Sequence, residues 1–344
     1  MSFMLNEIKE QPDVIGKLVA AESGKVSALA AEIKARGIEY VIMAARGTSD
    51  HAAIYGKYLI ESKNGLPVGL AASSVYSLYS GKMKMDRALV IGVSQSGQAT
   101  DVAEYLEKSK AAGALTASIT NVDGSTLTKV ADHYILCNAG PEKGVAATKT
   151  YTSTLAALYL LSATLAGESN AADKLAECAE AMKGALKVES FCKEKAERYR
   201  FMQGGYVLSR GYNYPTALEA GLKLMETNYV GMRAYSSADF QHGPIAAVEG
   251  QPCFLFAAPG KAMQNMLDIA AKLKEHKAEI AVISSDDKAL AAGDVPFKLD
   301  VEIDEELSPM SYIIPIQFLA YYLAVTKGLD PDNPRGLSKV TLTR

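Results

Sequence analysis

The sequence predicts an α/β fold of two tandem domains, each a parallel sheet flanked by helices, with N-terminal helices and a C-terminal tail. Two observations lead to this prediction. Apolar runs of strand length, such as 40-YVIMAA-45 and 88-ALVIGVS-94, alternate with longer amphipathic stretches, which is the pattern of a parallel sheet buried on both faces. The same pattern then recurs at an offset of about 165 residues, which indicates that one domain was duplicated.

Three segments of the first half recur in the second half. They are 40–47 as 206–211, 88–95 as 253–260, and 115–120 as 280–285. Apolar residues at helical spacing predict N-terminal helices that end at Gly37. Gly, Ser and Asn gather in 166-AGESNAAD-173, so we place the join between the domains there. The predicted organisation is N-terminal helices in 1–37, a first domain in 38–168, a second domain in 169–332 and a tail in 333–344.

Composition restricts what the protein binds. The 344 residues are 49% apolar and 22% charged, which is enough to bury two cores. A net charge of -3 without a dense Lys/Arg stripe argues against nucleic-acid binding, so any bound anion should be small. The N-terminus does not resemble a signal peptide, and no apolar run reaches the ~20 residues of a membrane span. We therefore expect a cytoplasmic protein with no nucleic-acid or membrane partner.

The cysteines show no metal-binding or disulfide pattern. Cys137, Cys178, Cys192 and Cys253 are scattered without a CxxC pair, which favours neither a zinc ribbon nor a disulfide framework. We expect four buried, reduced thiols.

Two loops in the first domain combine glycine with hydroxyl side chains between a strand and a helix. They are 46-RGTSDHA-52 and 94-SQSGQAT-100. N-capping of the helices is the simple alternative, but the second loop has more small polar residues than a cap requires, which favours a phosphate cradle. Neither GxGxxG nor GxxxxGK[ST] is present, so a monophosphate ester is the expected ligand. The candidate residues are Thr48, Ser49, Ser94, Gln95, Ser96 and Thr100, with Glu142 in a third loop, 139-AGPEKGVAATK-149.

One helix in the second domain carries a charged stripe. The segment 214-YPTALEAGLKLMETN-228 places Glu219, Lys223 and Glu226 on one face. A salt-bridged surface stripe is the alternative. The neighbouring face is apolar, with Leu218, Leu222 and Met225. We therefore expect a mostly buried helix whose charges line a pocket, where a carboxylate beside an ammonium can serve as a general base.

Two further segments contain candidate residues. His242 lies in the loop 236-SSADFQHGP-244, where a polar surface role is the alternative. Lys339 lies in the tail 333-NPRGLSKVTLTR-344, whose alternation of apolar and polar residues predicts packing, with disorder as the alternative.

Together these segments resemble the sugar isomerase (SIS) domain family. The resemblance covers nearly the whole chain and points to the double-SIS isomerase half of glucosamine-6-phosphate synthase and its stand-alone relatives. Among these, the SIS-type glucosamine-6-phosphate deaminases are the most similar, through 46–52, 143–149, 235–244 and 336–341. The fructosamine-6-phosphate deglycases share much of the pattern. The resemblance implies two flavodoxin-like three-layer domains and a homodimer in which the His242 loop completes the partner's site.

The resemblance also implies roles for single residues. Ser49, Ser94, Gln95 and Ser96 match positions that hold the sugar phosphate, and Val145 matches a backbone contact to the sugar. The remaining members of the candidate binding set are Thr48, Thr100, Glu142, Ala147 and Ser338. The sequence departs from the synthase at Ala99 and Ala147, where the synthase has hydroxyls, and at Met225, where it has lysine.

For catalysis, the resemblance makes Glu226 the proton-shuttling glutamate, Lys223 the active-site lysine, His242 the ring-opening histidine and Lys339 the tail lysine. Proton transfer between C2 and C1 of an amino sugar gives an imine that water hydrolyses to release ammonia. We expect no metal or redox cofactor. Because the chain starts Met1-Ser2-Phe3 and holds only the isomerase half, deamination of glucosamine 6-phosphate is the expected direction.

Three other functions stay open at this stage. Deglycation of a fructose-amine 6-phosphate needs a larger pocket, and aldose-ketose isomerisation of a hexose phosphate involves no nitrogen. A phosphosugar sensor without turnover is the alternative from another class, and it predicts loss of Glu226 or an attached DNA-binding segment. Neither of these two features is seen in the sequence.

Overall fold

The computed structural model describes residues 2–339, and the chain forms two compact units. The first unit contains 13–142, 149–176 and 338–339, and the second contains 2–12, 143–148 and 177–337. Residues 340–344 of the predicted tail lie outside the described residues. The predicted domain boundary near residue 168 stays a prediction.

A single long helix stands where several N-terminal helices were expected. Helix α1 (Phe3–Ala35) begins in the second unit and continues into the first, with Pro12 inside it. The buried apolar stripe runs across the proline without a break, from Ile8 to Ile15 and Leu18. That continuous burial on both sides of Pro12 accounts for one element instead of two.

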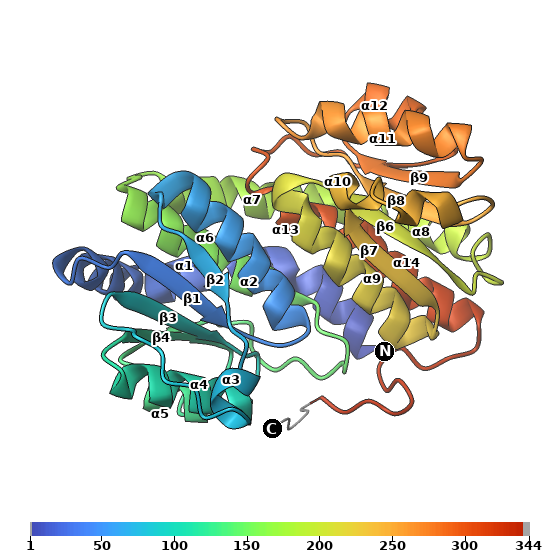
Figure 1. Cartoon of the computed structure of the whole chain (residues 1–344). Coiled ribbons are helices and arrows are strands. Elements are labelled where there is room, and N and C mark those ends of the chain that lie inside the picture. Colours follow the sequence, from blue (N-terminus) through green and yellow to red (C-terminus); the bar gives the residue numbers. More distant parts are fainter. Residues whose placement is uncertain (1, 340–344) are drawn as a thin grey trace. The chain divides into compact units, whose positions relative to one another are not determined.

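The first unit is a five-stranded parallel sheet between helices. Its elements are β1 (Tyr40–Ala44), α2 (Thr48–Leu59), the π-helical turn η1 (Ile60–Asn64), β2 (Val68–Leu70), α3 (Ser74–Ser77), β3 (Ala88–Val93), α4 (Thr100–Ala111), β4 (Leu115–Thr120), α5 (Thr126–Val130), β5 (His133–Leu136) and α6 (Lys149–Ala166). The strand order is β2-β1-β3-β4-β5. Figure 1 shows α3, α4 and α5 on one face of this sheet and α2 and α6 on the other. The order reverses between β1 and β3, so ligands are expected beside the carboxyl ends of these two strands.

The second unit repeats this architecture. Its elements are α7 (Ala171–Leu186, which begins in the first unit), α8 (Glu189–Ala196), β6 (Gly204–Ser209), η2 (Gly211–Asn213), α9 (Tyr214–Asn228), β7 (Gly231–Ser236), α10 (Ser237–Phe240), η3 (Pro244–Ala247), β8 (Pro252–Phe256), α11 (Met263–Glu275), β9 (Glu279–Ser284), α12 (Asp287–Ala291), β10 (Val295–Lys298), α13 (Ser308–Tyr312) and α14 (Ile314–Thr326). Its parallel sheet has the order β7-β6-β8-β9-β10, which is the order of the first sheet. The predicted duplication and fold class are confirmed.

Both sheets are buried on their two faces. Every residue of β3 and β4 is buried, as expected for central strands covered by helices on both sides. In the second unit, α11 and α12 pack on one face of the sheet, while α9 and α14 lie on the other (Figure 1). The four cysteines are free and buried, which confirms the expectation for them. Within residues 2–339, no helix has the length and apolar character that crossing a membrane requires.

An aspartate before the last strand of each sheet fixes the neighbouring strand. In the first unit, Asp132 accepts hydrogen bonds from the backbone N–H and the hydroxyl of Thr116, at 3.0 and 2.8 Å. In the second unit, Asp294 accepts one from the N–H of Ile280 at 2.8 Å. The repeat therefore extends from strand order to individual side-chain contacts.

Candidate active site

The loop after β3 contains backbone donors suited to an anion. Ser94 is buried, with 8% of its surface exposed, and Gln95 and Ser96 follow in half-buried positions. Among the described residues, the N–H groups of Gln95 and Ser96 have no hydrogen-bond acceptor. Two adjacent N–H donors just before a helix form the kind of site that binds a phosphate.

Gly97 holds this loop close to the next one. Its φ is +63°, and a Cβ at this position would lie 2.1 Å from Oγ of Ser125 and 2.8 Å from Oγ1 of Thr120. The carbonyl of Gly97 accepts from the N–H of Leu127 at 3.1 Å, and the carbonyl of Gln95 accepts from Oγ1 of Thr120 at 3.2 Å. Only glycine fits there, because any side chain would collide with the loop after β4.

An ion pair joins the first phosphate-binding candidate loop to the second. Arg46, which precedes Gly47 and α2, donates from Nε and Nη2 to Oδ2 of Asp101, both at 2.8 Å. Asp101 lies in the first turn of α4 and is buried. Thr48 and Ser49 are half-buried in the first turn of α2. The sequence reasoning missed Asp101, because its partner Arg46 is 55 residues away in sequence.

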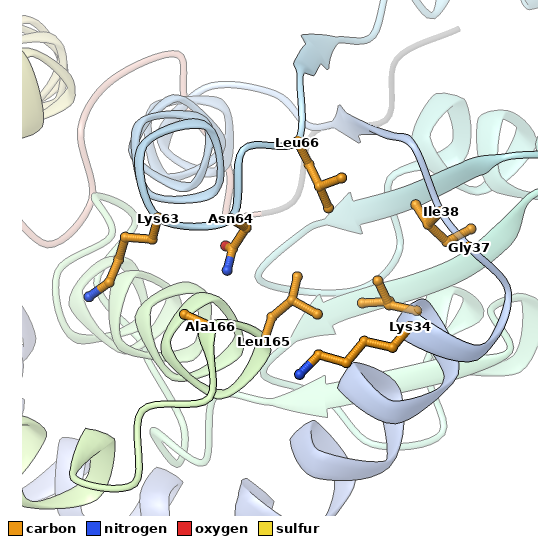
Figure 2. A pocket seen from close by; sticks show the side chains of 9 residues that line it. Lys34, Gly37, Ile38, Lys63, Asn64, Leu66, Leu165 and Ala166 are labelled. Atoms are coloured by element: carbon orange, nitrogen blue, oxygen red, sulfur yellow. The ribbon is translucent and has the colours of Figure 1, made fainter.

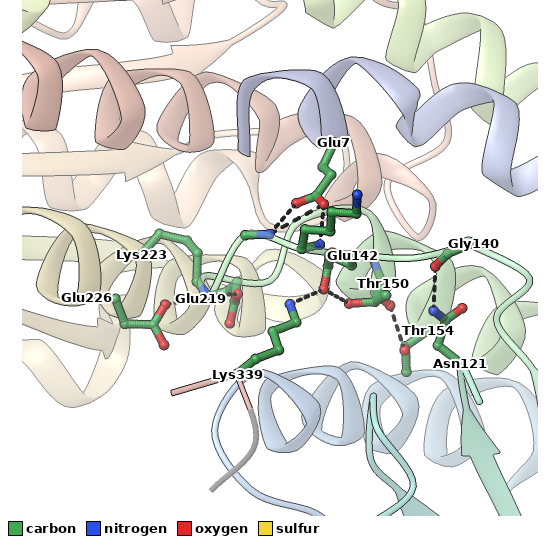
Figure 3. A network of polar contacts seen from close by, with 12 residues as sticks. Glu7, Asn121, Gly140, Glu142, Thr150, Thr154, Glu219, Lys223, Glu226 and Lys339 are labelled. Atoms are coloured by element: carbon green, nitrogen blue, oxygen red, sulfur yellow. Dashed lines mark hydrogen bonds and ion pairs between the residues drawn. The ribbon is translucent and has the colours of Figure 1, made fainter. Parts of the chain in front are cut away.

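Glu142 and the tail lysine meet in the first unit. Oε2 of Glu142 lies 2.7 Å from Nζ of Lys339 and accepts from the hydroxyl of Thr150, also at 2.7 Å (Figure 3). Oε1 accepts from the N–H of Thr150 at 3.1 Å. The Glu142 side chain is fully buried, so the pair is well shielded from water. The described end of the tail therefore packs at Lys339, while Ser338 and Thr100 are exposed.

Helix α9 of the second unit carries a buried ammonium between two carboxylates. Nζ of Lys223 lies 3.1 Å from Oε1 of Glu219 and 2.7 Å from Oε2 of Glu226 (Figure 3). Lys223 and Glu219 are fully buried, whereas 21% of the Glu226 side chain is exposed. Burial alone would lower the pKa of Lys223, but the two carboxylates outweigh it and raise this pKa well above its ordinary value. The two carboxylates therefore favour the charged form of Lys223.

The buried face of α9 differs from the predicted one. The apolar residues expected to face the core are the more exposed ones: Leu218 and Leu222 are half-buried, and 40% of Met225 is exposed. Ala217, Ala220 and Leu224 are buried instead. Small side chains let the helix backbone lie close to the sheet, and the charged stripe turns inward with them. The prediction of a mostly buried helix is confirmed, but its stated reason was wrong.

The remaining candidates lie in loops of the second unit. His242 is exposed, and no hydrogen bond of its side chain occurs within residues 2–339. The N–H of Val145 donates to the carbonyl of Asp332 at 3.2 Å, which leaves its own carbonyl as the group for a sugar contact. Glu7 accepts from the N–H of Gly144 at 3.2 Å and so fixes the loop that contains Val145 and the half-buried Ala147. Glu7 was also missed, because it is distant in sequence.

A separate pocket of the first unit has no candidate site residue in its lining. It has a volume of about 300 Å³ and lies where α1 and α6 end and where β1 and β2 begin (Figure 2). Its lining is Ile33, Lys34, Gly37, Ile38, Lys63, Asn64, Leu66, Leu165 and Ala166. Lys63 is already paired with Glu168 at 2.8 Å. Because the pocket is at the amino ends of the strands, it is distinct from the phosphate-binding candidate loops.

Relatives share both the sequence pattern and the fold. The chain is 36% identical over 340 residues to the glutamine--fructose-6-phosphate aminotransferase [isomerizing] of Methanothermobacter thermautotrophicus, covering 98% of this chain and 57% of that protein. The Pyrococcus horikoshii protein of the same name is 36% identical over 346 residues, with the same coverage. The chain thus spans a little over half the length of these curated relatives.

Solved structures match along almost the whole chain. A putative phosphosugar isomerase from Silicibacter pomeroyi superimposes with a TM-score of 0.88 and 31% identity, covering 96% of this chain and all of that one. The C-terminal domain of glucosamine-fructose-6-phosphate aminotransferase from Francisella tularensis gives 0.87 and 27%, covering 97% and 98% of the two chains. The glucosamine-6-phosphate deaminase of Thermotoga maritima, at 0.79 and 22% with 99% and 100% covered, shares the fold. The SIS domain family matches residues 36–163 and 205–327, so the chain belongs to this family, with two SIS domains.

Proposed function

We propose that the chain converts glucosamine 6-phosphate to fructose 6-phosphate and ammonia. Glu226 takes the proton from C2 of the open-chain sugar and returns it to C1. The C2 amine loses a proton and becomes an imine while O1 gains a proton and becomes a hydroxyl, and water then adds to the imine to give the ketone and free ammonia. Lys223 stabilises the negative charge that develops on O1 while the proton is in transit.

The observation that supports this proposal is the charge arrangement on α9. A single ammonium, Nζ of Lys223, lies between the carboxyl groups of Glu219 and Glu226. Glu219 is fully buried and holds Lys223 in place, while the partly exposed Glu226 is the carboxylate that a substrate reaches. A fixed cation beside an accessible base is what a proton transfer through an enolate-like intermediate requires.

The phosphate has its proposed site in the first domain. The N–H groups of Gln95 and Ser96, with the hydroxyls of Ser94, Ser96 and Ser49, supply donors for a monophosphate ester. No Lys or Arg is needed at these atoms, because successive backbone N–H donors in a loop favour an anion on their own. The expected ligand is therefore a phosphosugar bound through its 6-phosphate.

The relatives named above support a second candidate, the synthetic direction from fructose 6-phosphate. Their 36% identity extends along 98% of this chain. Both directions use the same proton transfer, so the direction must be measured. Deglycation of a fructose-amine 6-phosphate remains the third outcome.

The deciding experiment is ammonia release from glucosamine 6-phosphate by the purified chain, with fructose 6-phosphate measured by a coupled assay. Glu226→Gln should lower turnover by roughly 10²-fold or more. Glu177→Gln, on the exposed side of α7, is the matched control and should leave turnover unchanged. Release of ammonia that survives in Glu226→Gln would refute the assigned base. If the native chain is inactive here but forms glucosamine 6-phosphate from fructose 6-phosphate and an ammonium salt, the second candidate replaces the first.

A further inference from the structure

The second domain has loops equivalent to those of the proposed phosphate site. Because both sheets have the same strand order, the loops after β6 and β8 flank the second sheet's switch point as the loops after β1 and β3 flank the first. Gly211 follows β6 as Gly47 follows β1, and both have positive φ, +63° and +53°. Lys261 follows β8 as Ser96 follows β3, and the two residues are 165 positions apart.

A carboxylate of the protein itself occupies the space between these second-domain loops. Oε2 of Glu305 accepts from the N–H of Lys261 at 2.7 Å, and Oε1 accepts from the N–H of Ala262 at 3.1 Å. A Cβ on Gly260 would lie 2.4 Å from Cδ of Glu305, and one on Gly211 would lie 3.9 Å from Oε1. Both glycine loops therefore leave room for this carboxylate.

The two domains differ at the equivalent backbone donor. The N–H of Lys261 is bound by Glu305, whereas the N–H of Ser96 has no acceptor among residues 2–339. Glutamates in the loops after the last strands also behave differently. Glu142 of the first domain accepts a hydrogen bond from Thr150 and pairs with Lys339, whereas Glu305 of the second domain accepts from the backbone of the loop after β8.

We propose that Glu305 takes the place of a phosphate in the second SIS domain, so that this domain's anion site is filled from within and each chain binds one phosphosugar, in the first domain. The inference rests on the proposed phosphate site of the first domain. Two oxygens of a carboxylate accept from two adjacent N–H groups as two oxygens of a phosphate would. As part of the chain, Glu305 is present at a high effective concentration, so free phosphate does not displace it.

The test is phosphate binding by a variant without this carboxylate. In Glu305→Ala, inorganic phosphate should raise the unfolding temperature by about 2 °C more than it does for the native chain, measured against chloride at equal ionic strength. Glu302→Ala is the matched control, because it removes an exposed glutamate a few residues away and changes the net charge equally. Calorimetric titration should give two phosphates per chain in Glu305→Ala and one in the native chain and the control.

A second variant keeps the test decisive if Glu305→Ala does not fold. Glu305→Gln retains the side-chain volume but faces one backbone N–H with its own NH2 group, so it should also gain phosphate binding. Amide NMR shifts of Lys261 and Ala262 on adding phosphate locate the new site. If neither folded variant gains a phosphate, or if the native chain already binds two, the inference is overturned. If the native chain binds none while a Glu305 variant binds one, the first-domain phosphate site fails and the role of Glu305 stands.

Discussion

Lys223 and Glu226 lie one turn apart on α9 with 2.7 Å between Nζ and Oε2, yet Lys223 is fully buried while Glu226 reaches the surface. A buried ammonium is stable only while its carboxylates remain. The same contact thus serves the fold and the proposed chemistry, and the two contributions can be separated by measurement.

Lys223→Met should destabilise the second unit strongly. It leaves the fully buried Glu219 without its cation, and removing one partner of a buried pair costs about 3–5 kcal/mol. The free energy of unfolding in urea measures this loss. Glu219→Gln combined with Lys223→Met should recover part of it, and an additive loss in the double variant would contradict the account.

The stabilisation that Lys223 contributes to the second unit has a defined pH dependence. The pKa of Lys223 is raised on folding, so its stabilisation is fully present below the unfolded-state pKa of about 10.4 and is lost only as pH rises through the folded-state value. The stability difference between the native chain and the variant that combines Glu219→Gln with Lys223→Met, which has no unpaired buried carboxylate at position 219, should therefore be constant from about pH 6 to pH 9. A difference that shrinks within this range would show that Lys223 titrates there.

Asp132→Asn should show the opposite pH behaviour in the first unit. Burial pushes the pKa of Asp132 upward, but hydrogen bonds from Lys110 and Thr116 outweigh it and hold this pKa below its usual range. The stabilisation is present above about pH 4 and is lost as pH falls through the lowered value. We expect Asp132→Asn to cost about 1–2 kcal/mol at pH 6.

Urea unfolding between pH 3 and pH 6 checks this expectation. The difference between the native chain and Asp132→Asn should be constant above about pH 4 and should begin to shrink as the pH falls toward 3. Asp173→Asn, on the exposed start of α7, is the control and should show no difference at either end. A difference for Asp132→Asn that is as large at pH 3 as at pH 6 would mean that the shape of the side chain, not its charge, carries the contact.

Gly97→Ala should disrupt the phosphate-binding candidate loop. The new Cβ would lie only 2.1 Å from Oγ of Ser125. The alanine would also have to adopt a φ of +63°, which residues with a side chain rarely adopt. Gly124→Ala is a matched control, because Gly124 has a φ of +67° with nothing within 4 Å of a Cβ. Each substitution should lower the free energy of unfolding by about 1 kcal/mol, because alanine is strained at a positive φ. Only Gly97→Ala adds a collision with a neighbouring side chain.

We therefore expect Gly97→Ala to raise KM for the phosphosugar at least tenfold, while Gly124→Ala leaves it unchanged. Combining Gly97→Ala with Ser125→Gly removes the two closest colliding atoms, Oγ and Cβ of Ser125, and should restore part of the affinity. Equal KM values for the two single variants would show that the loop tolerates the displacement.

The sequence predicted the elements whose patterns are local. The helix at 214–228 has the predicted bounds, and the recurring segment 115–120 is a strand over these same residues. Strands β2, β7 and β10 were not predicted, because they lie at or near the sheet edges, where burial is partial and the apolar pattern is weak.

The sequence predicted those residues of the candidate site that lie close together in one segment. Glu219, Lys223 and Glu226 were found because helical spacing places them on one face. Asp101 and Glu305 were missed, because their partners are 55 and 44 residues away in sequence and no local pattern records such contacts. Contacts of this kind become visible only when the fold brings the elements together.

The exposure of His242 leads to a prediction about assembly. We propose a homodimer in which His242 of each subunit completes the site that contains Glu226 of the other. Glu226→Gln and His242→Ala subunits should each be inactive alone. In an equimolar mixture, half of the dimers are mixed, and each mixed dimer has one intact site, so activity should return to about a quarter of the native value.

The mixture is prepared by unfolding the two variants and refolding them together, and the native chain treated in the same way is the reference. A mixture that stays inactive, although sedimentation shows dimers, would place both residues in the site of one subunit.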